Sequence, residues 1–129
     1  MVVGTGNKIE DFGVGFFTKY GDGGVDVSPI GDLYKSEVYE VGRYLGVLPE
    51  ILQAAPTDGL FGDDRTDEDQ LGATYDELEW AMRLVESGAE ETHLTSRQSQ
   101  VLAIFKRLNK ANQHKMIPNQ ILYEFFFKN

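Results

Sequence analysis

The chain has 129 residues, of which 41% are hydrophobic and 12% aromatic, so it can form one ordinary domain with a core and is not disordered throughout. The 21 acidic and 12 basic residues give a net charge of -9, which disfavours a general binder of nucleic-acid backbones. The absence of cysteine excludes disulfides and thiolate metal sites, and no apolar run has the length of a membrane helix. We therefore expect a globular protein with no nucleic-acid or membrane partner, and the absence of a secretory leader favours the cytoplasm.

Two short apolar segments predict β-strands. The first is Met1–Gly4, which runs into a Gly-Thr-Gly-Asn loop, and the second is Val25–Ile30. A buried parallel strand needs neighbours on both sides, and two strands are too few for a complete α/β domain. We expect residues 1–129 to form a single, incomplete domain that is mostly helical and is the second half of a larger α/β fold.

The first half of the chain predicts three helices. Asn7 can cap a helix that begins near Lys8, and Pro49 can begin a short helix that ends at Gln53. Asp32 is the predicted cap of the helix between them, and Gly46 is its predicted stop. The apolar stripe expected on this middle helix comprises Tyr34, Val38, Val41 and Leu45.

The second half predicts two longer helices behind a long loop. Ala55–Gly72 has no periodicity and predicts a long loop, which in compact domains is functional or disordered. Thr74 begins a capping-box pattern, and its helix is expected to stop near Gly88. Thr95 begins the last helix, and residues 111–129 are interpreted as a basic tail.

A few residues could carry chemistry, and each also has a purely structural interpretation. The Gly4–Asn7 turn suits phosphate or adenine, or is simply a tight strand-to-helix connection. Glu10 could be a single carboxylate holding Mg²⁺, or an acid favoured by the helix dipole. Lys19 and Lys35 lie beside turns and are either anion contacts or surface lysines.

The pair His114–Lys115 is either a functional basic site or a solvated part of the tail. With only two distant histidines and no cysteine, a zinc site is not expected. A hydrolase triad has no support either, because no Gly-x-Ser-x-Gly elbow is present.

Taken together, these segments resemble NAD synthetase of the ammonia-dependent type. The matching stretches are VVGTGNKIED at 2–11, FTKYGDGGVD at 17–26, PIGDLYK at 29–35, PTDGL at 56–60, TDEDQLG at 66–72, and His114–Lys115 followed by Pro118. Each stretch is short, but together they occur in the family's order and extend over nearly the whole chain. The resemblance implies an α/β, doubly wound, parallel-sheet nucleotide-binding fold of the adenine nucleotide hydrolase-like class, that of N-type ATP pyrophosphatases.

The resemblance also implies a reaction and a set of ligands. Such enzymes use ATP to adenylate the carboxylate of deamido-NAD⁺, release pyrophosphate, and let ammonia displace AMP to give NAD⁺. By the same resemblance, Glu10 is the Mg²⁺ ligand and Lys35 a phosphate-binding cation. The other contacts implied are Thr5 and Thr57 with ATP, and Lys19, Asp26, His114 and Lys115 with deamido-NAD⁺.

One departure from the family pattern limits what this chain can do. The pyrophosphate-binding loop Ser-Gly-Gly-x-Asp-Ser, which belongs to the first half of the family's fold, is not in the sequence. We therefore expect the chain to represent the C-terminal half of a homodimeric synthetase and to be inactive alone. A non-catalytic interaction or dimerisation module derived from the same fold is the alternative, and glutamine instead of free ammonia as nitrogen source stays open.

Overall fold

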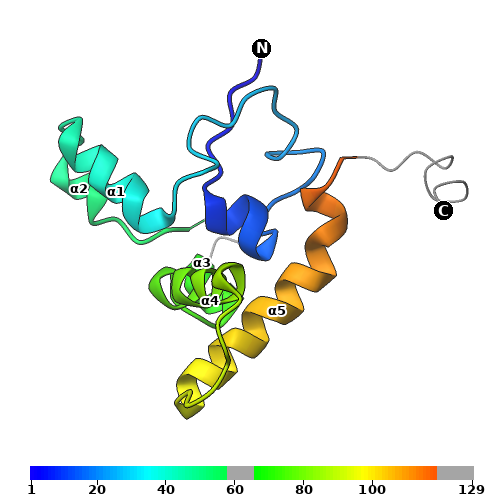
Figure 1. Ribbon diagram of the computed structural model, residues 1–129. Coiled ribbons are helices and arrows are strands. Elements are labelled where there is room, and N and C mark those ends of the chain that lie inside the picture. Colours follow the sequence, from blue (N-terminus) through cyan, green and yellow to red (C-terminus); the bar gives the residue numbers. More distant parts are fainter. Residues whose placement is uncertain (58–65, 119–129) are drawn as a thin grey trace, which may run out of the picture.

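The computed structural model describes residues 1–57 and 66–118. The parts of the predicted loop and tail at 58–65 and 119–129 lie outside the described residues. The elements in chain order are a π-helix η1 (Ile9–Val14), α1 (Lys35–Tyr44), α2 (Pro49–Leu52), α3 (Asp67–Leu71), α4 (Tyr75–Ser87) and α5 (Ser96–Met116). Figure 1 shows η1 at the centre, with α4 and α5 against it and the α1–α2 pair projecting to one side.

The hydrophobic core lies where η1, α4 and α5 meet. Helices α4 and α5 contribute residues spaced three or four apart, the periodicity that places side chains on one helical face, and η1 contributes Ile9 and Val14, five apart. The most deeply buried apolar residues of the three helices are Ile9, Val14, Leu78, Ala81, Val101 and Phe105. The packing therefore fixes the short η1 between two longer helices, and η1 carries the candidate site described below.

The two predicted strands pair with each other, but only through one parallel bridge between Val3 and Val27. Gly4 N–H donates to the Val27 carbonyl at 2.7 Å, and Asp26 N–H donates to the Val2 carbonyl at 2.9 Å. No longer ladder occurs in the part of the chain that is described, so the expected strands are reduced to this contact. Pro29, which has no N–H, follows Val27 closely and cannot extend the ladder.

Helices α4 and α5 begin where the capping patterns predict. Thr74 accepts a hydrogen bond from the Glu77 N–H at 3.2 Å, and Thr95 accepts one from the Gln98 N–H at 3.2 Å. The Glu77 and Gln98 side chains accept from the cap N–H groups in return, which completes both capping boxes. Gly88, with φ of 64°, ends α4 in the left-handed conformation, as predicted.

The prediction for α1 is wrong in two respects. The N-cap is Tyr34 and not Asp32, because the chain is still turning there, with Leu33 N–H bonded to the Ile30 carbonyl. The expected apolar stripe is not buried along its length: Tyr34 is 5% exposed, but Leu45 is 71% exposed. Only the start of α1 is held against the body of the molecule, whereas its second half projects with α2 (Figure 1).

Two further boundaries differ from the prediction. Thr66 and Asp69 form a capping box inside the predicted loop and begin the short helix α3. Helix α5 continues to Met116, so His114 and Lys115 belong to its last turn and not to a tail. Pro118 explains this end, since the residue before a proline is pushed out of the helical region and Ile117 is extended. No helix in the described ranges is both long enough and apolar enough to cross a membrane.

Candidate functional site

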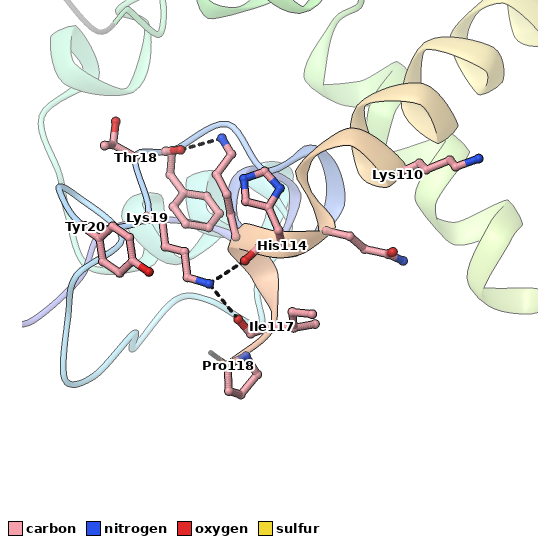
Figure 2. Close-up of a pocket in the computed structure, with 10 residues that line it drawn as sticks. Thr18, Lys19, Tyr20, Lys110, His114, Ile117 and Pro118 are labelled. Carbon is pink, nitrogen blue, oxygen red and sulfur yellow. Dashed lines mark hydrogen bonds between the residues drawn. The ribbon is translucent and has the colours of Figure 1, made fainter. Parts of the chain in front are cut away.

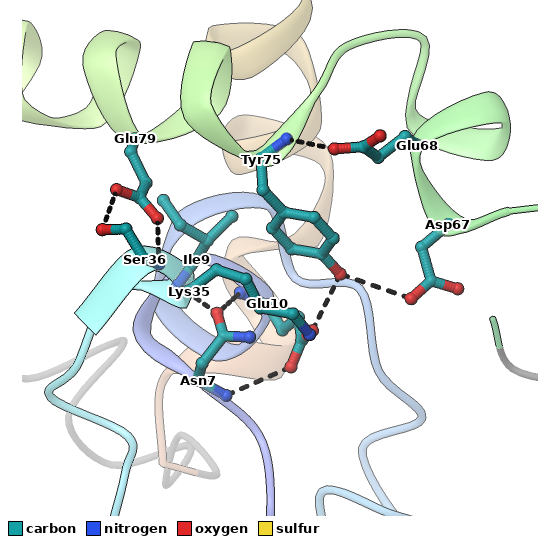
Figure 3. Close-up of polar contacts among 9 residues, drawn as sticks. All are labelled: Asn7, Ile9, Glu10, Lys35, Ser36, Asp67, Glu68, Tyr75 and Glu79. Carbon is teal, nitrogen blue, oxygen red and sulfur yellow. Dashed lines mark hydrogen bonds and ion pairs between the residues drawn. The ribbon is translucent and has the colours of Figure 1, made fainter. Parts of the chain in front are cut away.

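The start of η1 is organised by Asn7, whose side chain is 2% exposed. Its Oδ1 accepts hydrogen bonds from the N–H groups of Ile9 at 3.0 Å and Glu10 at 3.2 Å. This satisfies donors that the first turn of a helix leaves unpaired, as expected of an asparagine at this position. Because the turn is fixed in this way, the Glu10 side chain is directed towards α1 and α4 (Figure 3).

Glu10, Lys35 and Tyr75 form one cluster, called here the Glu10 cluster. The Glu10 Oε1 atom accepts hydrogen bonds from Lys35 Nζ at 3.0 Å and from the Tyr75 hydroxyl at 2.8 Å. The Lys35 ammonium also lies 4.6 Å from the centre of the Tyr75 ring, within the range of a cation–π contact. The structure thus brings together the residues predicted to bind metal and phosphate, and adds Tyr75 to them.

The short helix α3 closes one side of this cluster. Asp67 N–H donates to the Pro56 carbonyl at 3.1 Å, so the start of α3 lies against Pro56. Asp67 Oδ2 is 3.4 Å from the Tyr75 hydroxyl, and Glu68 Oε1 accepts from the Tyr75 N–H at 2.8 Å. Thr57 follows Pro56 directly in the sequence, and Thr5, which is exposed, precedes Asn7 by two positions.

A second site surrounds the last turn of α5. An open cavity of about 960 Å³ is lined there by Phe17, Thr18, Lys19, Tyr20, Lys110, Gln113, His114, Lys115, Ile117 and Pro118. Figure 2 shows Lys19 reaching towards the end of α5, where its ammonium donates to the His114 and Ile117 carbonyls. We call this the lysine cavity, because Lys19, Lys110 and Lys115 give it a positive charge.

Three of the four residues predicted to contact deamido-NAD⁺ line the lysine cavity: Lys19, His114 and Lys115. The fourth, Asp26, is exposed, and its carboxylate accepts a hydrogen bond from the Val2 N–H at 2.6 Å. Asp26 is not among the described residues that line the cavity. The structure therefore groups the basic residues and leaves Asp26 at the bridge between the two predicted strands.

Burial and neighbouring carboxylates shift two pKa values near the Glu10 cluster. Burial, with Glu10 and Asp67 close to its hydroxyl, raises the pKa of Tyr75, so this hydroxyl stays protonated and acts as a donor. Burial, with Glu10 and Asp22 nearby, raises the pKa of Asp11 to about 6. The Asp11 side chain lines a cavity of about 180 Å³ together with Gly4, Gly6 and Lys115.

The Glu10 carboxylate is compatible with Mg²⁺ that takes most of its ligands from outside this part of the chain. No three His, Asp or Glu side chains in the described segments are arranged to hold a metal ion between them. Mg²⁺ bound with nucleotides commonly uses one or two carboxylates and takes its other ligands from phosphates and water. Glu10 fits this role, provided that its oxygen is shared with, or released from, Lys35 and Tyr75.

Sequence reasoning missed two residues of this region. Neither Tyr75 nor Glu79 is among the site residues predicted from the sequence. Both are buried in the structure, with 4% and 6% exposure, and both face the start of α1. Their spacing of one helical turn was the available signal, but it does not by itself identify the partners.

Known proteins match this chain over nearly its whole length. The family model described as NAD synthase matches residues 1–118. The chain belongs to the NAD synthase family. The NH(3)-dependent NAD(+) synthetase of Methanococcoides burtonii is 46% identical over 127 residues, covering 95% of this chain and 47% of the relative. That of Archaeoglobus fulgidus is 51% identical over 88 residues, covering 68% and 35%.

Solved structures of NAD synthase relatives share the arrangement seen here. NMN synthetase from Francisella tularensis superimposes with a TM-score of 0.73 at 33% identity, covering 92% of this chain and 45% of that one. The NH3-dependent NAD synthetase from Campylobacter jejuni, in complex with nitrate, gives 0.64 at 28% identity, covering 93% and 44%. The chain therefore spans between about a third and a half of the length of these relatives.

Proposed function

We propose that this chain supplies part of the active site of an ammonia-dependent NAD⁺ synthetase, a ligase that amidates deamido-NAD⁺ at the expense of ATP. The observation that carries the proposal is the Glu10–Lys35 pair, whose atoms lie 3.0 Å apart. These two residues come from segments that match the family, and the resemblance gives them adjacent roles at the triphosphate. Family membership over residues 1–118 supports the same reading.

The chemistry requires the chain to handle phosphate charge. A carboxylate is a poor electrophile, so ATP transfers AMP to it and pyrophosphate leaves; ammonia then attacks the carbonyl carbon and AMP departs with the bonding electrons. Lys35 has three N–H donors, and those not bonded to Glu10 can meet phosphate oxygens. Glu10 would hold Mg²⁺, which neutralises phosphate charge when bound.

The remaining contacts divide between the two sites. We assign Thr5 and Thr57 to ATP, because the resemblance implies these contacts and hydroxyls can donate to phosphate or ribose oxygens. We assign Lys19, His114 and Lys115 to deamido-NAD⁺, whose pyrophosphate and carboxylate are anions that fit the charge of the lysine cavity. Asp26 can meet a ribose hydroxyl only if the dinucleotide extends towards the Val3–Val27 bridge.

We further propose that residues 1–129 act as one incomplete domain. It would be completed by the half of the family fold that carries the pyrophosphate-binding loop, within a homodimer in the cytoplasm. The alternative of a non-catalytic module is not favoured, because the match to relatives named as NAD(+) synthetases extends through both candidate sites. A doubly wound parallel sheet would then form across the two halves, with the Val3–Val27 bridge as this chain's share of it.

The test is the exchange of labelled pyrophosphate into ATP, which reports adenylation without the ammonia step. This chain alone should give no exchange, whereas a complete synthetase that contains it should exchange only when deamido-NAD⁺ is present. Lys35→Ala should abolish exchange in the complete enzyme, whereas Lys106→Ala, at an exposed lysine outside both candidate sites, should not. Exchange unaffected by Lys35→Ala would refute the assignment of this site.

A second candidate substrate is a mononucleotide. The structure with a TM-score of 0.73 is described as an NMN synthetase, so the same half-fold serves a relative named for a different product. The two candidates are separated by supplying deamido-NAD⁺ and nicotinic acid mononucleotide in turn and comparing kcat/KM. A preference for the mononucleotide would identify the product as NMN instead of NAD⁺. The assignments at the Glu10 cluster would stand, because ATP activates the carboxylate in both reactions.

A further inference from the structure

Helix α4 presents two polar side chains, Tyr75 and Glu79, to the beginning of α1. They are four residues apart, so they lie on the same helical face one turn from each other. Both are largely buried in the structure, and neither belongs to the roles assigned above (Figure 3). A buried carboxylate is costly unless it is well paired, so the partners of Glu79 indicate what it does.

Glu79 binds the first turn of α1 with both carboxylate oxygens. Its Oε1 accepts from the Ser36 N–H at 2.8 Å, and its Oε2 accepts from the Ser36 hydroxyl at 2.7 Å. The first N–H groups of a helix have no partner within that helix, and a negative charge is favoured there. Glu79 thus caps α1 from another helix and fixes the backbone next to Lys35.

Tyr75 acts on the neighbouring side chain. Its hydroxyl and the Lys35 ammonium both donate to the same atom, Glu10 Oε1, at 2.8 and 3.0 Å. The aromatic ring of Tyr75 also lies beside the Lys35 ammonium, 4.6 Å from its centre. The Tyr75 hydroxyl therefore restricts the Glu10 carboxylate, and the Tyr75 ring restricts the Lys35 ammonium.

We propose that Tyr75 and Glu79 are positioning residues that set the Glu10–Lys35 pair for phosphate binding. Glu79 holds the backbone that carries Lys35, and Tyr75 holds the ammonium and the carboxylate in contact. This rests on the proposed function for the phosphate role, but the positioning itself is a property of this chain. Its consequence is that α4, which contributes no assigned ligand contact, controls the direction in which the free donors of Lys35 point.

The first experiment measures the positioning without any activity. The chain is exposed briefly to an amine-acetylating reagent, and the modification of Lys35 is compared by mass spectrometry with that of Lys110, an exposed lysine in the same molecule. We expect Tyr75→Phe to raise the Lys35/Lys110 ratio about 3- to 10-fold, because one charge-assisted network is weakened. Tyr75→Leu should raise it further, since the ring is also lost.

Matched controls separate positioning from general loosening. Tyr44→Phe removes a hydroxyl from a tyrosine that is 89% exposed, and Glu40→Gln neutralises an exposed acid on α1. Both should leave the ratio unchanged, whereas Glu79→Gln should raise it. An unchanged ratio in folded Tyr75→Phe and Tyr75→Leu would overturn the proposal, with folding checked by circular dichroism.

The second experiment uses a complete synthetase that contains this chain. We expect Tyr75→Phe to raise the KM for ATP by about 10-fold with little change in the KM for deamido-NAD⁺. A fall in kcat alone, with both KM values unchanged, would contradict positioning at the phosphate pair and would indicate a structural role. An enzyme whose turnover did not need ATP would overturn the proposed function, and the labelling ratio would still decide the positioning.

Discussion

Lys19 donates to a backbone carbonyl of the helix end that carries Lys115, and Lys115 donates to backbone carbonyls of the segment that precedes Lys19. Lys19 Nζ donates to the His114 carbonyl, and Lys115 Nζ donates to the carbonyls of Gly15 at 2.6 Å and Phe17 at 2.8 Å. The carbonyls involved lie at or just beyond the ends of α5 and η1, where positive charge is favoured. Two lysines assigned to a dinucleotide thus also join the two segments that form the lysine cavity.

We predict that Lys115→Met destabilises this chain by about 1–3 kcal/mol, because two backbone carbonyls lose a charged donor while the apolar stem is kept. Lys110→Met, which changes an exposed lysine of the same cavity, should cost much less. The measurement is urea unfolding followed by circular dichroism. Equal stability of the two variants would mean that the hydrogen bonds from Lys115 to the Gly15 and Phe17 carbonyls contribute little to the stability of the fold.

In a complete synthetase the same substitution should also weaken binding of the dinucleotide. Loss of one charge-assisted contact corresponds to about a 10- to 100-fold rise in the KM for deamido-NAD⁺. The KM for ATP should move much less, because Lys115 lies at the opposite end of η1 from Glu10. A rise in the KM for ATP alone would indicate that the lysine cavity binds ATP and not the dinucleotide.

Gly15→Ala should be far more damaging than Gly88→Ala, although both glycines are left-handed, with φ of 66° and 64°. A Cβ on Gly15 would lie 2.3 Å from the Asn112 Cβ, whereas one on Gly88 would meet nothing within 4 Å. The Gly88 variant should lose only about 1 kcal/mol from the backbone conformation. For Gly15 we expect a loss of more than about 3 kcal/mol or failure to fold, measured by thermal unfolding. Similar melting temperatures would show that α5 can move away from η1.

Asp11 should make the chain less stable as the pH rises through about 6. Its pKa in the folded chain is raised from 3.8 to about 6 by burial and by Glu10 and Asp22, so the folded state disfavours the charged form. The stability that protonated Asp11 gives is complete below about pH 4 and is lost by about pH 7. Because the carboxylate is partly solvated, we expect the change to be about 1 kcal/mol.

The measurement is the free energy of unfolding of Asp11→Asn and of the unchanged chain at several values between pH 4 and 8. The substitution should remove this part of the pH dependence and raise stability at pH 7 and above. Asp32→Asn, at an exposed aspartate, provides the matched control. Parallel pH curves for the Asp11 variant and the unchanged chain would contradict the prediction.

Glu10→Gln should affect both stability and the magnesium dependence of a complete synthetase. In this chain it removes the ion pair with Lys35 but keeps an acceptor for Tyr75, so a loss of about 1–2 kcal/mol is expected. In the enzyme it removes the charge that a hard cation needs, so more Mg²⁺ should be required for half-maximal rate. Glu50→Gln is the exposed control. An unchanged magnesium requirement would leave Glu10 with a structural role only.

The sequence alone determined the features whose physics is local. The caps of α4 and α5 depend on side chains three residues from the N–H groups they satisfy, so Thr74 and Thr95 could be read directly. Asn7 at the start of η1 follows the same rule, because its side chain accepts from the Glu10 N–H three residues on. The ordered series of short motifs likewise identified the family, because that comparison needs only the order of residues along the chain.

Only the tertiary structure decided which faces and which distant residues meet. Tyr75 and Glu10 are 65 positions apart, and their contact exists because α4 packs on η1 beside the start of α1. The apolar stripe of α1 predicted burial from periodicity, yet Leu45 is exposed, because periodicity shows that a face is apolar but not what covers it. The charge of Lys115 is evident from its residue type, whereas the length of α5 and its packing against Gly15 decide where that charge lies.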